Sequence, residues 1–450
     1  MKIFLSILLI FFTLSCGGGG GNSNVLDVQL SDVDTGVIEP PEPPIVIPDE
    51  IVITEVKVPL LIIQVEFTDY SFNSSTQVWN QKLFGTQTGE LNNYFLEISQ
   101  NTFMFEAAKE TEGTTNDGII RVSLNFKHPD SGTDNFQAIA IPAIEMADAY
   151  INFAQYDINK NKRIETKELQ IMFLVAGGEN ATGIHPSIWA HQFYIENVNL
   201  DDVSLMQVNG GSYTAFGERH FSITGTDASI GIIAHELGHG VFNLEDLYDF
   251  DGSSEGIGNF GLMGSGSWGL KNDEYPGETP VHMIAWSKIK SKFLLSKQIS
   301  TTTNNLQVQG TTSSTYQPIR INTQRAGEYF LLEYRAPLGY DQGLFILEDK
   351  VFPGGLAIWH IDENQNDNSQ DNSRLVDLVE ADGFHLDTAG NQGLINNLFF
   401  SDNPSANYLG EISNTSTPDT SNLNSGANTN ISIKNISTTS TVANVDIELQ

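Results

Sequence analysis

The sequence His-Glu-Leu-Gly-His at residues 235–239 carries residue types that can bind a metal ion and move a proton. Two residues four apart on a helix lie on one face, so the imidazoles of His235 and His239 can converge on one ion. Zn²⁺ accepts such nitrogens at about 2.0–2.1 Å. Glu236 lies one step round the helix, where a general base for a metal-bound water is needed. Taken alone, the pentapeptide also fits a buried helix with two structural histidines.

A catalytic zinc site needs a third protein ligand and an open position for water. Glu245 and Asp246 follow the expected helix end at Phe242 and Asn243, where Asn tolerates the left-handed conformation that turns the chain back. Farther on, residues 259–268 form a glycine-rich turn that contains a methionine. Either carboxylate is therefore a candidate third ligand.

Three sequence blocks together resemble the immune inhibitor A family of secreted bacterial metalloproteases. They are His-Glu-x-x-His, the Asp-Leu-Tyr-Asp block at 246–249, and Gly-Leu-Met-Gly-Ser-Gly-Ser-Trp at 261–268. The family belongs to the metzincin group, whose zinc site rests on a methionine-containing turn. The site residues that the resemblance implies are the zinc ligands His235, His239 and Asp246, the base Glu236 and the supporting Met263.

The spacing departs from the usual metzincin pattern in one respect. That pattern has a glycine seven residues after the first His and the third ligand ten residues after it. Here those positions hold Phe242 and Glu245, so aligning the Asp-Leu-Tyr-Asp block requires one additional residue. Asn243 can supply the turn that the glycine normally makes. We therefore expect Asp246 as the third ligand, with Glu245 as the alternative.

The elements that position this site are expected within an α+β fold. Apolar runs and helical spacing before and after the zinc motif predict strands at 59–67, 103–106 and 170–178, and helices at 91–99, 135–150 and 280–288. The strand–helix–strand opening also resembles immune inhibitor A catalytic domains. We therefore expect a metzincin-like zinc protease domain over residues 51–295.

The amino-acid composition changes from about residue 296, after which Thr, Ser, Asn and Gln dominate. Alternating apolar and polar residues predict short strands at 328–334, 355–361, 431–433 and 442–447. We expect residues 296–450 to form a β-rich, sandwich-like C-terminal domain that packs on the catalytic domain.

Residues 157–168 have the alternating oxygen ligands of an EF-hand loop. The calcium ligands that this pattern predicts are Asp157, Asn159, Asn161 and Glu168. Lys162 stands where the pattern has a glycine, and the alternative interpretation is a polar turn capped by its own side chains. Residues 249–256 fit a second calcium loop and a solvated loop equally well.

The single cysteine, Cys16, follows a lysine and a short apolar run, which is typical of a signal peptide. Its setting after Leu14 and Ser15 resembles the lipid-attachment site of bacterial lipoproteins. We expect residues 1–16 to be a lipoprotein-type signal peptide ending at the lipidated Cys16, with ordinary secretion as the alternative. Residues 17–50, rich in Gly and Pro, would form a tether. This predicts an exported protein that is lipid-anchored at the bacterial cell envelope or outer surface, or released from it.

Composition limits the partners. Asp and Glu number 56 against 22 Lys and Arg, giving a net charge of −34, which repels nucleic acid and anionic membranes. We expect a monomeric zinc endopeptidase that cleaves extracellular proteins or peptides. Two alternatives are a catalytically inactive calcium- and zinc-binding surface adhesion lipoprotein, and a structural zinc protein, which would need a closed four-ligand shell.

Other residues near the motif are weaker candidates. Tyr248 and Tyr275 qualify as oxyanion stabilisers by residue type alone. A structural role is expected for four further histidines: His128, His185, His191 and His220.

Overall fold

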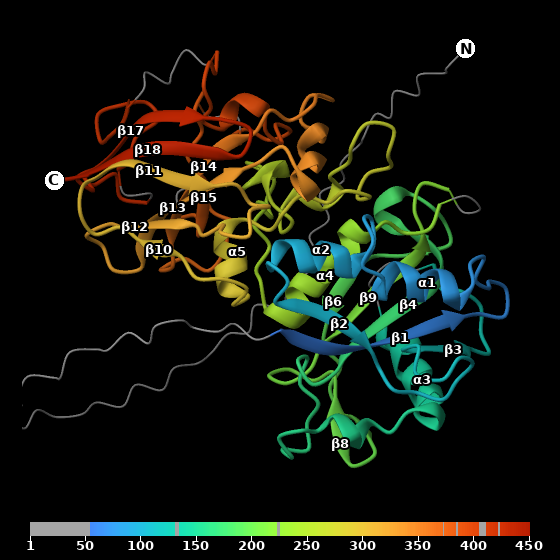
Figure 1. Cartoon of the computed structure of the whole chain (residues 1–450). Coiled ribbons are helices and arrows are strands. Elements are labelled where there is room, and N and C mark those ends of the chain that lie inside the picture. Colours follow the sequence, from blue (N-terminus) through green and yellow to red (C-terminus); the bar gives the residue numbers. More distant parts are fainter. Residues whose placement is uncertain are drawn as a thin grey trace, which may run out of the picture.

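The computed structural model describes residues 55–130, 135–222, 226–371, 373–383, 386–404, 411–421 and 424–450. Cys16, the expected signal peptide and the expected tether lie outside the described residues. The described chain forms two lobes that pack side by side (Figure 1). A search of these ranges finds no helix with the length and apolar character that a membrane span requires.

A mostly parallel seven-stranded sheet forms the first lobe. Its order is β2-β1-β4-β9-β6, and β3 and β5 pair with β1 and β4. β6 runs antiparallel to β9. The strands are β1 (Val56–Glu66), β2 (Phe103–Ala107), β3 (Ile119–Ser123), β4 (Gln170–Glu179), β5 (Ser187–Ile188), β6 (His191–Phe193) and β9 (Tyr213–Arg219). A separate ladder joins β7 (Val198–Leu200) and β8 (Val203–Leu205).

The strands predicted at 59–67 and 170–178 are β1 and β4, and they lie inside the sheet, where continuous apolar runs suit strands whose two faces are covered by helices. Leu60 and Ile62 of β1 face one core, and Leu61 and Ile63 face the other. Helices α2 and α4 contribute to the first core, whereas α3 contributes to the second (Figure 1). The α-helices are α1 (Thr76–Phe84), α2 (Leu91–Ile98), α3 (Gln137–Ala147), α4 (Ile230–Phe242) and α5 (Ala285–Lys290).

Short 3₁₀ helices connect several of these elements. They are η1 (Asp148–Tyr150), η2 (Phe153–Tyr156), η3 (Asn180–Thr182), η4 (Gly258–Phe260), η5 (Ser265–Trp268), η6 (Gly339–Ile346) and η7 (Ile395–Asn397). Two of them, η4 and η5, flank Met263 and shape the turn around it.

Two sheets packed face to face form the second lobe. One has the order β10-β12-β13-β14-β15 and the other β11-β18-β17-β16. Their strands are β10 (Lys297–Gln298), β11 (Thr303–Gln309), β12 (Ile319–Asn322), β13 (Glu328–Arg335), β14 (Gly355–Asp362), β15 (Val376–Leu378), β16 (Glu411–Ile412), β17 (Ile431–Thr438) and β18 (Val442–Leu449). The expected α+β fold with a β-rich, sandwich-like remainder is confirmed.

Strands β13 and β14 are buried on both faces. Phe330 and Leu332 face the second sheet of the sandwich, whereas Leu331 and Trp359 face the core that contains α4. The two lobes therefore share one apolar core. The boundary between residues 295 and 296 remains a prediction, since it divides the sheets in sequence but not this core.

The predicted helix at 280–288 is partly wrong, because α5 begins at Ala285. Residues 280–284 are not helical, and their backbone groups bind the turn around Met263. Val281 donates its N–H to the Gly266 carbonyl at 3.0 Å, and the His282 carbonyl accepts the N–H of Leu262 at 3.3 Å. A helix through 280–284 would direct these groups to its own backbone.

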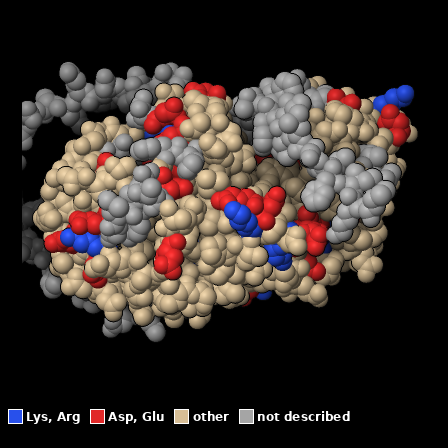
Figure 2. All heavy atoms as spheres, turned by 90° about the horizontal axis from the view of Figure 1, so that it is seen from above, with Lys and Arg blue, Asp and Glu red and all other residues tan. Residues whose placement is uncertain are grey.

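The charge on the face shown in Figure 2 is divided among separate groups. Acidic side chains form several small clusters, and some of them have Lys or Arg beside them. The described acidic side chains on this face are therefore not collected in one patch.

Candidate metal centre

Helix α4 carries the two motif histidines and ends where the sequence predicts. Its C-cap residue Asn243 has φ 53°, the left-handed conformation that Asn tolerates. Asn243 donates its N–H to the His239 carbonyl at 3.0 Å, and Leu244 donates to the Gly238 carbonyl at 3.2 Å. This cap turns the chain back, so that the residues after α4 return to the histidine face.

Three ligand-type atoms meet at that face. The Nε2 atoms of His235 and His239 lie 3.2 Å apart, and each lies 3.1 Å from Oδ1 of Asp246. A tetrahedral ion with bonds of about 2.05 Å separates its ligand atoms by roughly 3.3 Å. The donor set of two imidazoles and one carboxylate also suits Zn²⁺, so both the chemistry and the spacing fit that ion.

The other ring nitrogen of each histidine is fixed by a backbone carbonyl. Nδ1 of His235 lies 2.8 Å from the Leu262 oxygen, and Nδ1 of His239 lies 2.6 Å from the Leu244 oxygen. A carbonyl can only accept, so Nδ1 of each ring carries a proton, and Nε2 is the nitrogen left to face Asp246 or an ion. This is the tautomer that a metal-binding histidine needs.

The two candidate third ligands are separated by the structure. Asp246 is buried beside the histidines, whereas Glu245 is half-exposed and pairs with Lys290 at 3.6 Å. Burial raises the pKa of Asp246, but the neighbouring His239 and His235 lower it further, so the net shift is downward. Burial lowers the pKa of His239, but the Asp246 carboxylate outweighs this effect and raises it to about 9. The site therefore favours a bound positive charge.

Glu236 lies beside this triangle and is almost fully buried. Burial raises its pKa, and the backbone N–H of Gln192 in β6 donates to its carboxylate. Among the described residues, its Oε1 has no hydrogen-bond partner. A buried carboxyl oxygen without a partner is costly, so a water or a substrate group has a place there.

Residues 244–263, which we call the ligand loop, run from the end of α4 to Met263. Met263 is buried and packs on Gly238, between the two histidines, where a Cβ would come within 2.7 Å of its sulfur. The Met263 carbonyl accepts the N–H of Leu247 at 2.8 Å. The methionine turn therefore supports both the helix and the segment that carries Asp246.

The residues of the EF-hand-like loop are brought together in part. Oxygens of Asp157 and Asn159 both accept the N–H of Asn161, and Glu168 accepts the N–H groups of Ile158 and Asn159. The side chain of Asn161 instead binds Arg163 N and Glu165. Lys162 has φ 64°, the conformation that the motif reserves for glycine. These contacts match the polar-turn alternative and leave the calcium prediction open.

The four remaining histidine candidates lie outside the triangle. His191 is held by the Trp189 carbonyl at 2.7 Å and the Tyr213 hydroxyl at 3.0 Å, and burial lowers its pKa. Burial lowers the pKa of His128 to about 4 and that of His220 to about 3. His185 pairs with Asp130 at 2.8 Å. These contacts agree with the expected structural roles.

Neither tyrosine candidate is identified as an oxyanion stabiliser. Tyr275 stacks on Phe221 with ring centroids 5.7 Å apart, and Tyr248 packs edge-on against Phe250. Sequence reasoning missed Gln192, whose N–H reaches Glu236, because only the pairing of β6 with β9 reveals that contact.

Comparison with known proteins agrees with this geometry. Residues 124–293 match the family model described as immune inhibitor A peptidase M6, catalytic domain. Pre-pro-metalloprotease PrtV from two strains of Vibrio cholerae serotype O1 is 30% identical over 156 residues, which cover 33% of this chain and 16% of each relative. The matched family segment contains α4 and the whole ligand loop, whereas β1, β2 and β3 of the same sheet precede it.

Proposed function

We propose, from the match of residues 124–293 to the immune inhibitor A peptidase family model, that the chain is a zinc-dependent endopeptidase. The observation that carries the proposal is the buried triangle of His235, His239 and Asp246, with Glu236 beside it. The fit of the triangle edges to a tetrahedral ion supports zinc over a hard cation, which would prefer six or more oxygen ligands.

Zinc bound by these three residues would lower the pKa of a coordinated water towards about 7 and polarise the scissile carbonyl. The carbonyls of Leu262 and Leu244 keep both imidazoles oriented by holding their Nδ1 protons. Met263 supports the helix beneath the histidines. We assign these residues to binding and orientation.

Glu236 is the general base in this proposal. Its raised pKa and partner-free Oε1 suit a group that accepts a proton from water and passes it to the leaving amine. The Gln192 N–H would hold the carboxylate in place during this transfer. Glu236 is therefore assigned to proton transfer rather than to metal binding.

The substrate is an extended segment of a protein or peptide, which we place along β6. Among the described strands β6 ends the sheet path, so a peptide strand could add at this edge beside the Gln192 N–H that Glu236 accepts. Because Gln192 of β6 contacts Glu236, a peptide paired there would lie beside the base. Extracellular proteins are the substrates consistent with the expected export.

A structural calcium ion at residues 157–168 is a second part of the proposal. The oxygens of Asp157, Asn159 and Glu168 already converge on one short stretch of backbone. Calcium would take over contacts now made by backbone amides, with Asn161 turning inward as the fourth side chain. Added Ca²⁺ should raise the melting temperature of the wild-type chain but not that of Asp157→Ala. An equal rise in the melting temperature of both proteins would contradict a calcium site at Asp157.

Lipid anchoring at Cys16 remains a prediction from the signal-peptide pattern. Mass spectrometry of the protein recovered from bacterial membranes would detect an acylated cysteine at the new N-terminus. Recovery of an unmodified chain cut elsewhere would favour ordinary secretion.

The proposed function is tested by casein cleavage with the purified chain, before and after a zinc chelator and after zinc is restored. We expect cleavage that the chelator abolishes and zinc restores, with about one zinc per chain. Stable zinc binding without cleavage of casein or a peptide library would support the alternative of an inactive surface-binding protein.

A further inference from the structure

The loop between β14 and β15, of which residues 363–371 and 373–375 are described, reaches from the β-rich lobe to the ligand loop. We call it the clamp loop. Its residue Asn368 is fully buried. The Asn368 amide nitrogen donates to the Leu247 carbonyl at 3.1 Å and to the Val376 carbonyl at 2.8 Å, and its oxygen accepts the Val376 N–H at 3.0 Å. A side chain from the second lobe thus holds the backbone next to Asp246.

Contacts to the Leu247 backbone fix the part of the ligand loop that directly follows Asp246. Its N–H donates to the Met263 carbonyl at 2.8 Å, and its carbonyl also accepts the Ile257 N–H at 2.9 Å. These groups belong to the two peptide planes that follow Asp246. Fixing both planes restricts the direction in which Asp246 can project its carboxylate.

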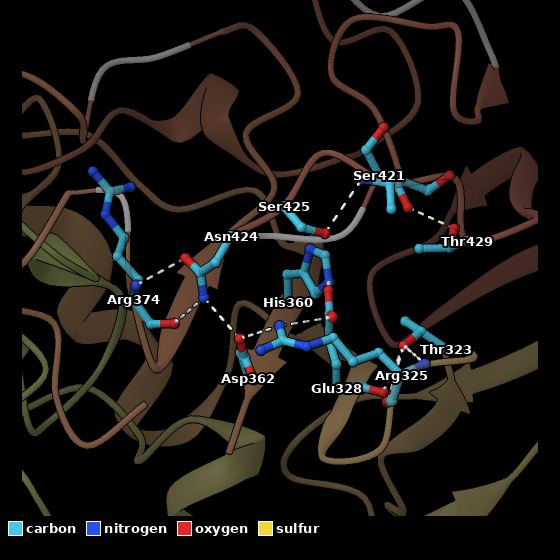
Figure 3. Close-up of polar contacts among 12 residues, drawn as sticks. Thr323, Arg325, Glu328, His360, Asp362, Arg374, Ser421, Asn424, Ser425 and Thr429 are labelled. Carbon is cyan, nitrogen blue, oxygen red and sulfur yellow. Dashed lines mark hydrogen bonds and ion pairs between the residues drawn. The ribbon is translucent and has the colours of Figure 1, made fainter. Parts of the chain in front are cut away.

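The clamp loop is itself anchored at both ends, as Figure 3 shows. Asp362, the last residue of β14, accepts from Arg325 at 2.6 Å and from the Asn424 amide at 2.8 Å. The oxygen of Asn424 accepts the N–H of Arg374 at 3.1 Å. Asn424 therefore joins the start and the end of the clamp loop, which leaves Asn368 little freedom to move.

A second contact joins the two loops. Ser253 donates its hydroxyl to Asp371 of the clamp loop at 3.0 Å and lies within hydrogen-bond distance of Asp249 at 2.9 Å. Asp371 is also paired with Arg374 at 3.6 Å. The ligand loop is thus contacted by the clamp loop on both sides of Asp249.

We propose that Asn368 is a positioning residue for the third zinc ligand, which makes the β-rich lobe part of the metal-binding unit. The proposal rests on the proposed zinc function. Partners outside the ligand shell orient the ligands, and their removal typically costs about 10- to 100-fold in metal affinity or activity. Asn368 acts on Asp246 through the Leu247 backbone and touches neither metal nor substrate.

The chain offers a matched control in Asn92, another fully buried asparagine. Its amide nitrogen donates to the Phe84 and Phe105 carbonyls at 3.1 and 2.9 Å, and its oxygen accepts the Phe105 N–H at 2.8 Å. These contacts copy those of Asn368 but bridge α1 and β2. Asn92→Ala and Asn368→Ala should therefore cost similar stability and differ only in their effect on the metal site.

The experiment measures zinc affinity by chelator competition, and thermal unfolding of the metal-free proteins, for the full chain and both variants. We expect Asn368→Ala to weaken zinc binding about 10- to 100-fold and to lower kcat more than it changes KM. Asn92→Ala should bind zinc within about twofold of the wild type. Equal zinc affinity of the two variants would overturn the positioning role, even if both melt earlier than the wild type.

Asn424→Ala carries the test if Asn368→Ala does not fold. It releases the clamp loop without touching the ligand loop, and we expect zinc binding to weaken several-fold. Wild-type zinc affinity in a folded Asn424→Ala would overturn the proposal. A wild-type chain that binds no zinc would instead overturn the proposed function, and this inference with it.

Discussion

Nε2 of His235 lies 3.1 Å from Oδ1 of Asp246, and this contact joins α4 to the ligand loop. His235 is presented by α4 and by the Leu262 carbonyl, whereas Asp246 is presented by a loop fixed at Leu247. The metal site therefore depends on two supports that meet at the methionine turn. Separate substitutions can test each of them.

Asp246→Asn and Glu245→Gln should behave differently, although the two residues are neighbours. The amide at position 246 removes the negative charge between two imidazoles, so zinc affinity should fall by more than about 100-fold, the upper end for an outer partner. Glu245 is half-exposed and its pair with Lys290 is long at 3.6 Å, so its loss should change stability by less than about 1 kcal/mol. Zinc titration of both variants checks this. A larger loss of zinc affinity in Glu245→Gln than in Asp246→Asn would show that Glu245 is the third zinc ligand.

Glu179 should make the stability of the metal-free protein depend on pH. Burial raises its pKa to about 7, although N–H groups of Ala190 and Gly217 lower it in part. The unfolded pKa is near 4.5, so the stabilising contribution is complete below that value and is lost as pH rises through 7. The loss at pH 8 is on the order of 3 kcal/mol.

Denaturant unfolding at pH 5 and pH 8 tests this assignment. Glu179→Gln cannot titrate, and its cost from the changed hydrogen bonds is the same at both values. The difference in unfolding free energy between wild type and Glu179→Gln should therefore shrink or reverse at pH 8. A difference that is constant with pH would show that Glu179 does not titrate in this range.

Lys162→Gly should stabilise the protein by about 0.5–1 kcal/mol. Lys162 has φ 64°, which strains a side chain but not glycine. Lys167→Gly, in a turn of the same loop without positive φ, should instead destabilise by a similar amount. Thermal unfolding of both variants in calcium-free buffer measures this difference. Destabilisation by both substitutions would mean that the strain at Lys162 is negligible.

Much of the framework follows from local sequence signals. The end of α4 is predicted because Asn243 can adopt the left-handed cap without help from distant residues. Strands β1 and β4 are predicted because their apolar runs are continuous. Such signals depend on only a few neighbouring residues, and the local structure that they favour is the one found in the folded protein.

Long-range contacts explain what the sequence left open. The choice between Glu245 and Asp246 depends on the path of the ligand loop, which Met263 and Asn368 set from far along the chain. The start of α5 at Ala285 depends on Val281, whose N–H is taken by Gly266. The pattern of apolar residues within either segment therefore predicts neither the third ligand nor the start of α5.

The measurement that tests the central claim most directly is kcat/KM for Glu236→Gln, made with the zinc content of the same sample. The substitution keeps the shape of the side chain but removes the base, and a general base contributes about 10²- to 10⁴-fold. We predict a fall of that size with about one zinc retained per chain. Wild-type cleavage by the zinc-loaded variant would contradict the assignment of Glu236 and the mechanism built on it.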